Sequence, residues 1–205
     1  TVASRASGIS GKKFGFMQSE AVLFEELADE LGLLRKPGEP SAWHRHPLAF
    51  LVEAADDICY HVMDVEDGFK AGVLSYEELE ALHRPWLSSE RMKRAGEIKD
   101  TQRRAEYFRA VTVDTMAREM VKVFEDNYAG LMDGTFDEEL AARIPQAAEF
   151  EAFKTAAKAK VYSARPVIEI EACGFEVIGG LLNAFVHAIE VEASGNDKGK
   201  ARSRT

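Results

Sequence analysis

Cysteine is scarce in this sequence, and continuous apolar runs of membrane-spanning length are missing. Only Cys59 and Cys173 occur, and both fall inside apolar helical patterns. We therefore interpret them as small core residues and not as a disulfide. This cysteine usage predicts a reducing, cytoplasmic location. No run approaches the roughly 18 apolar residues that cross a bilayer, and the first residues lack the apolar core of a signal peptide, so we expect no membrane partner.

Positive charge is also in short supply. The sequence has 26 Lys and Arg against 35 Asp and Glu, which gives a formal net charge of −9. This balance excludes a uniformly basic nucleic-acid footprint. Nucleic acid as a regulator stays open, although no feature of the sequence points to it. A small polyanionic substrate remains compatible with the composition if local cations or a metal ion neutralise it.

The spacing of apolar residues is helical along most of the chain. Apolar side chains recur every three or four positions, and no run alternates in the manner of a strand, so we predict an all-α fold. We expect one helical domain over residues 1–193 and a disordered basic segment over 194–205. Helix starts are predicted near Ser19, Pro47, Thr101, Ala147 and Pro166, and at two capping boxes, Ser75 with Glu78 and Thr135 with Glu138.

Core faces follow from the same spacing. In the long helix that begins near Thr101, the buried face should hold Val113, Met116, Met120 and Phe124. The helix that begins at Pro47 should bury Leu48, Leu51, Val52, Ala55, Cys59, Val62 and Met63.

The segment from His46 to Phe69 has an unusual charge pattern. It contains six acidic residues and no Lys or Arg, although like charges repel at helical spacing. At 100° per residue, Asp56, Tyr60 and Asp64 fall within about 80° of one another and form one stripe. The ordinary explanation is a solvated acidic face. The alternative is a site where Mg²⁺ or Mn²⁺ offsets the carboxylates.

A calcium EF-hand is excluded at this place. The segment from Asp64 to Gly68 looks superficially similar to an EF-hand loop. Setting Gly68 at the invariant sixth position would put Met63 at position 1, where a methionine cannot ligate calcium.

Three stretches together resemble one known family. RHPLAFLVEAADDICY at 45–60, followed by DVEDG at 64–68, closely resembles the dGTP triphosphohydrolases of the HD superfamily. KFGFMQSE at 13–20 is similar to the family segment that enters the preceding helix. The stretch from VYS at 161–163 through EACG at 171–174 to GGLL at 179–182 is similar to a late helix of the family. The resemblance covers most of the chain in the correct order.

The resemblance implies an oligomeric, all-helical enzyme with an HD-type domain. Such enzymes hydrolyse a deoxynucleoside triphosphate to the deoxynucleoside and tripolyphosphate, with one metal held by a histidine, a His-Asp pair and a distant aspartate. By motif position, Asp56 matches that aspartate. Tyr60 and Asp64 match residues that contact the sugar, and Lys13 matches a basic residue near the phosphates. Asp57 departs from relatives that carry lysine there, and we keep it as a substrate-binding candidate.

One part of the family's metal site is missing from this sequence. None of its five histidines is followed by aspartate, so the His-Asp pair is absent. In the family those ligands precede the region covered here. We therefore interpret the chain as a central-to-C-terminal fragment that is inactive by itself. Arg109 is a further candidate for phosphate contact, although a solvated face is the ordinary explanation. The rival hypothesis is a non-catalytic helical module that senses nucleotides or promotes oligomerisation.

Overall fold

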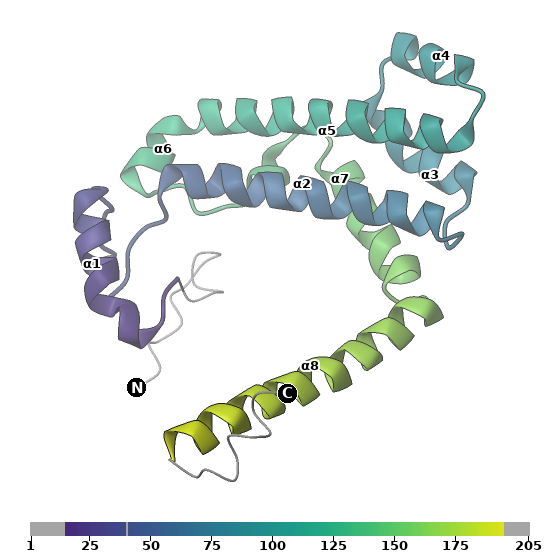
Figure 1. Ribbon diagram of the computed structural model, residues 1–205. Coiled ribbons are helices and arrows are strands. Elements are labelled where there is room, and N and C mark those ends of the chain that lie inside the picture. Colours follow the sequence, from purple (N-terminus) through teal and green to yellow (C-terminus); the bar gives the residue numbers. More distant parts are fainter. Residues whose placement is uncertain (1–14, 40, 195–205) are drawn as a thin grey trace. The chain divides into compact units, whose positions relative to one another are not determined.

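The computed structural model describes residues 15–39 and 41–194 (Figure 1). Throughout these residues the ordered elements are helices, and the pairing of Arg35 with Trp43 is an isolated bridge. The all-α prediction is therefore confirmed. The chain divides into two compact units, Thr1–Ala157 and Lys158–Thr205, which are described one at a time. The expectation of a single domain over 1–193 stays a prediction, and the basic segment predicted after it lies outside the described residues except for Ser194.

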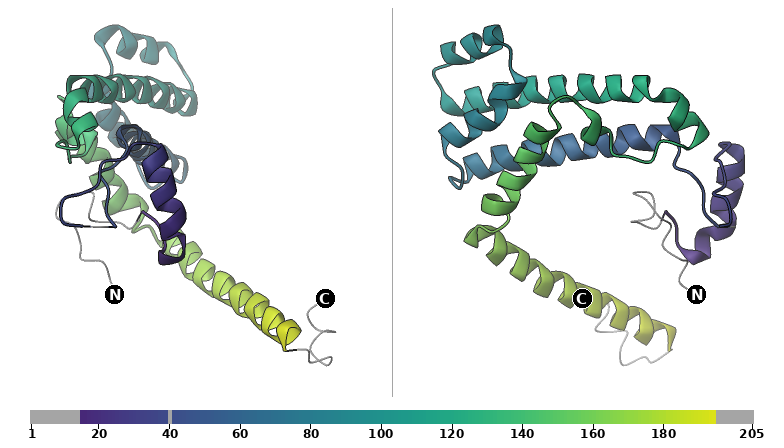
Figure 2. Two further views of the ribbon diagram at one scale, coloured as in Figure 1. Left: turned by 90° about the vertical axis from the view of Figure 1, so that its left-hand side faces the viewer. Right: turned by 180° about the vertical axis from the view of Figure 1, so that it is seen from behind.

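The first unit is built around two long helices, α2 (Pro47–Lys70) and α5 (Thr101–Asp126), which lie side by side (Figures 1 and 2). Helix α3 packs on α5, and α7 contacts both α2 and α3. The remaining helices of this unit are α1 (Ala21–Glu30), α3 (Tyr76–His83), α4 (Ser89–Glu97), α6 (Tyr128–Asp133) and α7 (Ala147–Ala156), with short 3-10 helices at Gln18–Glu20, Arg84–Trp86 and Leu140–Arg143.

Local capping chemistry sets several helix starts. At α2, Pro47 occupies the first turn and the His46 Nδ1 accepts the backbone N–H of Leu48 at 3.1 Å. At α3, the predicted capping box is confirmed: the Ser75 hydroxyl accepts from the Glu78 N–H at 3.2 Å, and the Glu78 carboxylate accepts from the Ser75 N–H at 3.0 Å. These starts were predictable because the partners are three residues apart or fewer.

The second predicted capping box is wrong. Helix α6 ends at Asp133 and is followed by Gly134, whose φ of 76° lies in the left-handed region. The Asp133 carboxylate then accepts both the N–H and the hydroxyl of Thr135, at 2.9 and 2.6 Å. Glu138 pairs instead with Arg143. With both Thr135 donors directed at Asp133, residues 135–138 do not begin a helix.

The centre of the unit contains a buried histidine. The His83 ring is fully buried, and its Nδ1 lies 2.7 Å from the hydroxyl oxygen of Thr112 on α5. The ring stacks on Phe108 with 5.8 Å between centroids and meets Phe153 of α7 edge-on at 5.0 Å. This contact joins α3, α5 and α7 at one point of the core.

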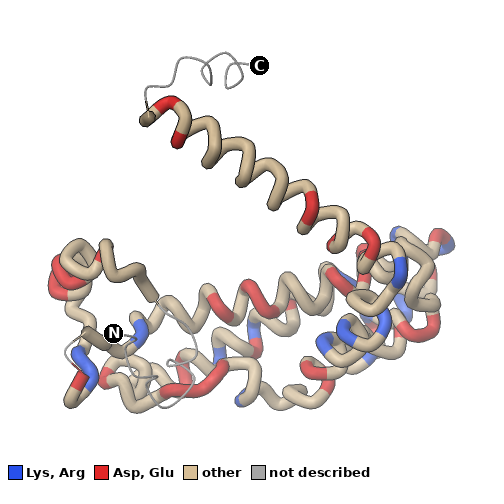
Figure 3. Tube along the Cα trace, turned by 90° about the horizontal axis from the view of Figure 1, so that it is seen from below, with Lys and Arg blue, Asp and Glu red and all other residues tan. Residues whose placement is uncertain are grey.

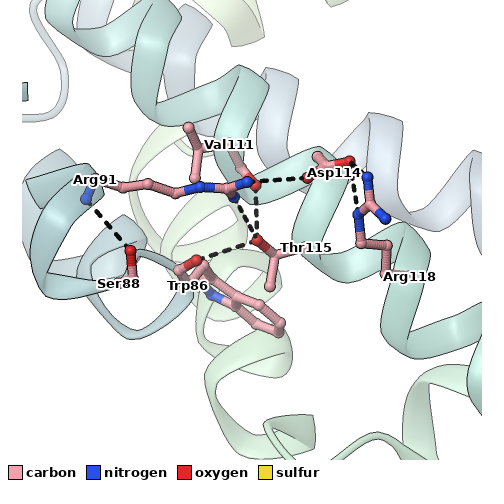
Figure 4. Close-up of polar contacts among 7 residues, drawn as sticks. All are labelled: Trp86, Ser88, Arg91, Val111, Asp114, Thr115 and Arg118. Atoms are coloured by element: carbon pink, nitrogen blue, oxygen red, sulfur yellow. Dashed lines mark hydrogen bonds and ion pairs between the residues drawn. The ribbon is translucent and has the colours of Figure 1, made fainter. Parts of the chain in front are cut away.

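A polar network fastens α4 to α5 (Figure 4). The Arg91 guanidinium donates to Asp114 and to Thr115, both at 3.4 Å. The Thr115 hydroxyl lies 2.9 Å from the carbonyl oxygen of Val111 and 3.2 Å from that of Trp86, either of which can accept its proton. Arg118 also binds Asp114 at 3.0 Å. The turn that follows α3 and the start of α4 are thereby fixed against the middle of α5.

The buried face of α2 is only partly the predicted one, since Val62 is buried as predicted but most of the other predicted residues are not. Leu48, Val52 and Met63 are 57%, 69% and 47% exposed, and Cys59 is also exposed. Helix α5 and the chain from the 3-10 helix Leu140–Arg143 to α7 cover a neighbouring side of α2. The side chains buried there are Phe50, Ala54, Ile58, Val62, Val65 and Glu66. Apolar residues occur on both sides, so the spacing did not identify which side is covered.

The other predictions of buried residues were partly correct for α5 and wrong for the two cysteines. In α5, Met116 and Met120 are buried as predicted, whereas Val113 and Phe124 are half-buried. The interpretation of the two cysteines as core residues is wrong, since Cys59 and Cys173 are both exposed, although they are free thiols as expected.

The second unit begins within the short π-helical stretch Ala157–Val161, which is followed by α8 (Arg165–Ala193). No residue of α8 is buried, and most of the helix carries neither acidic nor basic side chains (Figure 3). By length and composition alone, α8 is the one described helix that qualifies as a candidate membrane span, contrary to the expectation from the sequence.

Candidate functional site

Helix α2 carries the stripe of residues that the sequence singles out. Asp56, Tyr60 and Asp64 lie on successive turns, about 6 Å apart along the helix axis. Asp56 is exposed, Tyr60 is 60% exposed and Asp64 is half-buried. The structure therefore keeps the three side chains on one side of a single rigid helix.

Asp56 and Tyr60 are not engaged by the rest of the described chain. Within residues 15–39 and 41–194, neither side chain forms a hydrogen bond or ion pair. By contrast, Glu53 on the preceding turn accepts from the Arg45 guanidinium at 2.8 Å. The carboxylate of Asp56 and the phenol of Tyr60 are thus available to a ligand.

Asp57 occupies a different environment from its neighbour Asp56. It is half-buried, and burial raises the pKa of its carboxyl, although His61 one turn later acts in the opposite direction. Glu53 and Glu139 add further negative charge around it. His61 stacks on Phe150 of α7 with 4.9 Å between centroids, and burial lowers its pKa. Asp57 therefore lies toward the helix packing and away from the stripe.

Arg109 of α5 is committed to a buried carboxylate. Its guanidinium binds Glu66 Oε2 at 2.9 Å, while Lys70 binds Oε1 at 2.8 Å. The Glu66 side chain is only 2% exposed. Glu66 and Asp64 are two residues apart, which places them about 160° apart around α2. The structure therefore does not bring Arg109 to the stripe, and Lys13 lies outside the described residues.

The role of Glu66 is not evident from the sequence alone. In the sequence it is one of six acids in the segment from His46 to Phe69, which contains no Lys or Arg. Its position four residues before Lys70 was the available local signal, but its second partner is 43 positions away on α5. It is the only one of these six acids that is fully buried in the described structure.

The described residues do not by themselves supply a metal site. Among them, no group of three or more His, Cys, Asp or Glu side chains could hold a metal ion. A divalent ion such as Mg²⁺ binds oxygen ligands in an octahedral arrangement, and the acidic side chains near Asp56 on α2 do not form such a group. The donor set here therefore fits one ligand of such a site and not a complete one.

Comparison with known proteins identifies relatives over most of the chain. It is 34% identical to a deoxyguanosinetriphosphate triphosphohydrolase-like protein of Synechocystis, over 96% of this chain and 44% of that protein. A protein of the same name from Pseudomonas aeruginosa is 29% identical over 94% of this chain and 44% of its own length. A deoxyguanosinetriphosphate triphosphohydrolase of Klebsiella pneumoniae is 30% identical over 78% of this chain and 35% of its own.

These similarities confirm the family resemblance seen in the sequence. The chain spans less than half the length of the curated relatives that it matches. No family model matches the chain.

Proposed function

Since this chain is homologous to a segment of the deoxyguanosine triphosphate triphosphohydrolase-like proteins, we propose that it forms part of a metal-dependent deoxynucleoside triphosphate triphosphohydrolase. In the complete enzyme, Asp56 supplies one carboxylate ligand to a divalent metal, Mg²⁺ or Mn²⁺. Tyr60 and Asp64 contact the deoxyribose. The products are the deoxynucleoside, deoxyguanosine when the substrate is dGTP, and tripolyphosphate.

The observation that carries this proposal is that the side chains of Asp56 and Tyr60 on α2 have no partner among the described residues. A helix that presents an unpaired aspartate and, one turn later, an unpaired tyrosine holds two ligand-binding groups at a fixed separation. In a nucleotide the sugar is attached directly to the α-phosphate. Groups one turn apart are therefore suitably placed for a metal at the phosphate and for the adjoining sugar.

We do not assign Asp57 and Arg109 to substrate binding. Asp57 and Arg109 already contribute to packing and to the Glu66 ion pair, so we assign them to the support of α2. The remaining metal ligands and the phosphate contacts come from outside the described residues in this proposal. The isolated chain therefore serves as one wall of the site and not as an independent enzyme.

The test is the substitution Asp56→Asn in a complete protein that also carries the histidine and His-Asp ligands. Release of tripolyphosphate from each of the four deoxynucleoside triphosphates is measured with Mg²⁺ or Mn²⁺. Activity should fall by about two orders of magnitude or more, because an anionic metal ligand is lost. The matched control is Asp67→Asn, an exposed aspartate on the same side of α2 and three turns further on, which should retain activity.

Thermal unfolding of the isolated chain separates a ligand from a structural aspartate. Asp56 has no partner among the described residues, so Asp56→Asn should leave the stability level or raise it by a few tenths of a kcal/mol through weaker repulsion from Asp57. If the substitution unfolds the chain but leaves full activity per folded molecule in the complete protein, Asp56 is structural. The proposal is then overturned.

A further inference from the structure

Helix α7 carries a glutamate and a lysine beside α2, where the two helices pack together (Figure 1). Phe150 of α7 stacks on His61 of α2 with 4.9 Å between ring centroids. Glu151 directly follows Phe150, and Lys154 lies one turn after Phe150 on the same side of α7. The Lys154 ammonium lies 3.5 Å from the Glu151 carboxylate, and the two side chains are 54% and 58% exposed. This exposed pair holds its partners weakly, so both groups are accessible to a ligand.

The pair lies close to the part of α2 that carries Tyr60 and Asp64. Burial lowers the pKa of the His61 imidazole, and the charges of Lys154, Glu151 and Asp64 are among those that also act on it. His61 directly follows Tyr60 and precedes Asp64 by three residues. It therefore has Asp64 of the stripe and the two charged groups of α7 as neighbours.

The site proposed on α2 indicates where the base of a bound nucleotide lies. The metal at Asp56 marks the α-phosphate, and Tyr60 contacts the sugar one turn later. The base is attached to the sugar at a different carbon from the phosphate, so it extends beyond the sugar and away from the metal. Along the axis of α2, His61 lies about 7.5 Å beyond Asp56. Helix α7 therefore meets α2 at the level where the sugar ends and the base begins.

A carboxylate beside an ammonium matches the hydrogen-bonding edge of guanine. Guanine presents two adjacent donors, the N1–H and the N2 amino group, and next to them the acceptor O6. A carboxylate has acceptor oxygens only, whereas an ammonium has donors only, and lysine commonly donates to guanine O6 and N7. Adenine presents the reverse pattern, with an acceptor at N1 and an amino donor at N6. In the same position adenine would face the carboxylate with an acceptor and the ammonium with a donor.

We propose that Glu151 and Lys154 of α7 bind the base of the nucleotide and select guanine. Glu151 accepts from the N1–H and the N2 amino group, and Lys154 donates to O6. Cytosine repeats the unfavourable pattern of adenine, and thymine lacks the amino donor. This inference rests on the hydrolase function proposed for the stripe on α2, and it adds the residues that distinguish one base from another.

The substitution Glu151→Gln in the complete protein tests the role of the carboxylate. Tripolyphosphate release is measured with each of the four deoxynucleoside triphosphates, and the values of kcat/KM are compared. The wild-type protein should prefer dGTP, and the variant should lose about tenfold to a hundredfold in kcat/KM for dGTP. Glutamine can donate to adenine N1, so kcat/KM for dATP should stay level or rise. With deoxyinosine triphosphate, which lacks the N2 amino group, the loss should be smaller than with dGTP.

The substitution Lys154→Met tests the contact with O6. It removes the ammonium but keeps a side chain of similar length, and it should lower kcat/KM for dGTP more than for dATP. The matched controls are Glu125→Gln and Lys122→Met on α5, which are exposed and are not among the charges that act on His61. These controls should leave the preference among the four nucleotides unchanged. Circular dichroism of each variant checks the fold, which should be retained because both side chains of the pair are more than half exposed.

The outcomes separate this assignment from the hydrolase function itself. Equal losses for all four nucleotides, unchanged kinetics with dGTP, or a wild-type preference for another base would overturn the assignment of Glu151 and Lys154 and leave the hydrolase function standing. A complete wild-type protein that releases tripolyphosphate from none of the four nucleotides would overturn the hydrolase function, and this inference with it.

Discussion

Acidification should destabilise the first unit through His83. Burial lowers the pKa of this imidazole to about 3, against about 6.5 in an unfolded chain. Its Nε2 has no hydrogen-bond partner among the described residues, and the ring lies between Phe108 and Phe153. Protonation would therefore add a charge and an unsatisfied N–H to an aromatic core.

The sign and the size of the change in unfolding free energy with pH follow from proton linkage. Above pH 6.5 the histidine is neutral in both states and its contribution to stability is complete. As the pH falls below 6.5, the unfolded chain binds a proton that the folded chain does not. The free energy of unfolding then falls by about 1.4 kcal/mol per pH unit until the pH nears the folded pKa. Between pH 6 and pH 4 the loss from His83 alone amounts to about 2.5 kcal/mol.

The variant His83→Gln isolates this contribution from that of other titrating groups. Glutamine does not titrate and can keep a hydrogen bond to Thr112. Urea unfolding is followed at pH values between 4 and 7 by tryptophan fluorescence, to which Trp86 contributes from a buried position three residues after the histidine. The wild-type chain should lose about 2.5 kcal/mol more than the variant between pH 6 and pH 4. Parallel profiles for the two proteins would refute the assignment of a neutral, buried His83.

Three further predictions concern the site and α2. The isolated chain should release no tripolyphosphate from dGTP with Mg²⁺ or Mn²⁺ because it holds only part of a ligand set, and chelator-sensitive release would contradict the fragment interpretation. In the complete enzyme, Tyr60→Ala should weaken binding and loosen discrimination against ribonucleotides. Alanine at Tyr128, an exposed tyrosine on α6, is its control, and unchanged kinetics for both sugars would exclude a role at the sugar. Glu66→Gln should cost about 1–3 kcal/mol in urea unfolding because Lys70 and Arg109 lose one shared, buried partner. Asp67→Asn should cost less than about 0.5 kcal/mol, and equal losses would show that the buried pair adds nothing.

The parts of the fold that the sequence predicted depend on neighbours along the chain. The start of α2 at Pro47 and the box of Ser75 with Glu78 require partners within three residues, so their chemistry is visible in the sequence. The buried side of α2 depends instead on distant partners. Phe50 meets Phe136 with 5.7 Å between ring centroids, across 86 positions of sequence. Because α2 is apolar on more than one side, periodicity alone did not identify the side that is covered.

In the candidate site, too, the sequence predicted the features that depend on one helix and missed those that depend on tertiary packing. The stripe of Asp56, Tyr60 and Asp64 follows from helical arithmetic on one element, and the structure keeps it on α2. The engagement of Arg109 by Glu66 depends on how α5 lies against α2. Such a pairing is set by tertiary packing, which a run of acidic residues in the sequence does not reveal.

The exposed thiols provide each unit with its own attachment point for a spectroscopic probe. Cys59 is adjacent to Tyr60 on α2, so a fluorophore at this sulfur would respond to a nucleotide that settles on the stripe. Cys173 lies on the side of α8 away from Leu182 and Phe185, so a label there would leave these exposed apolar side chains uncovered. Single serine replacements of either cysteine would yield two singly labelled proteins, one reporting on α2 and the other on α8.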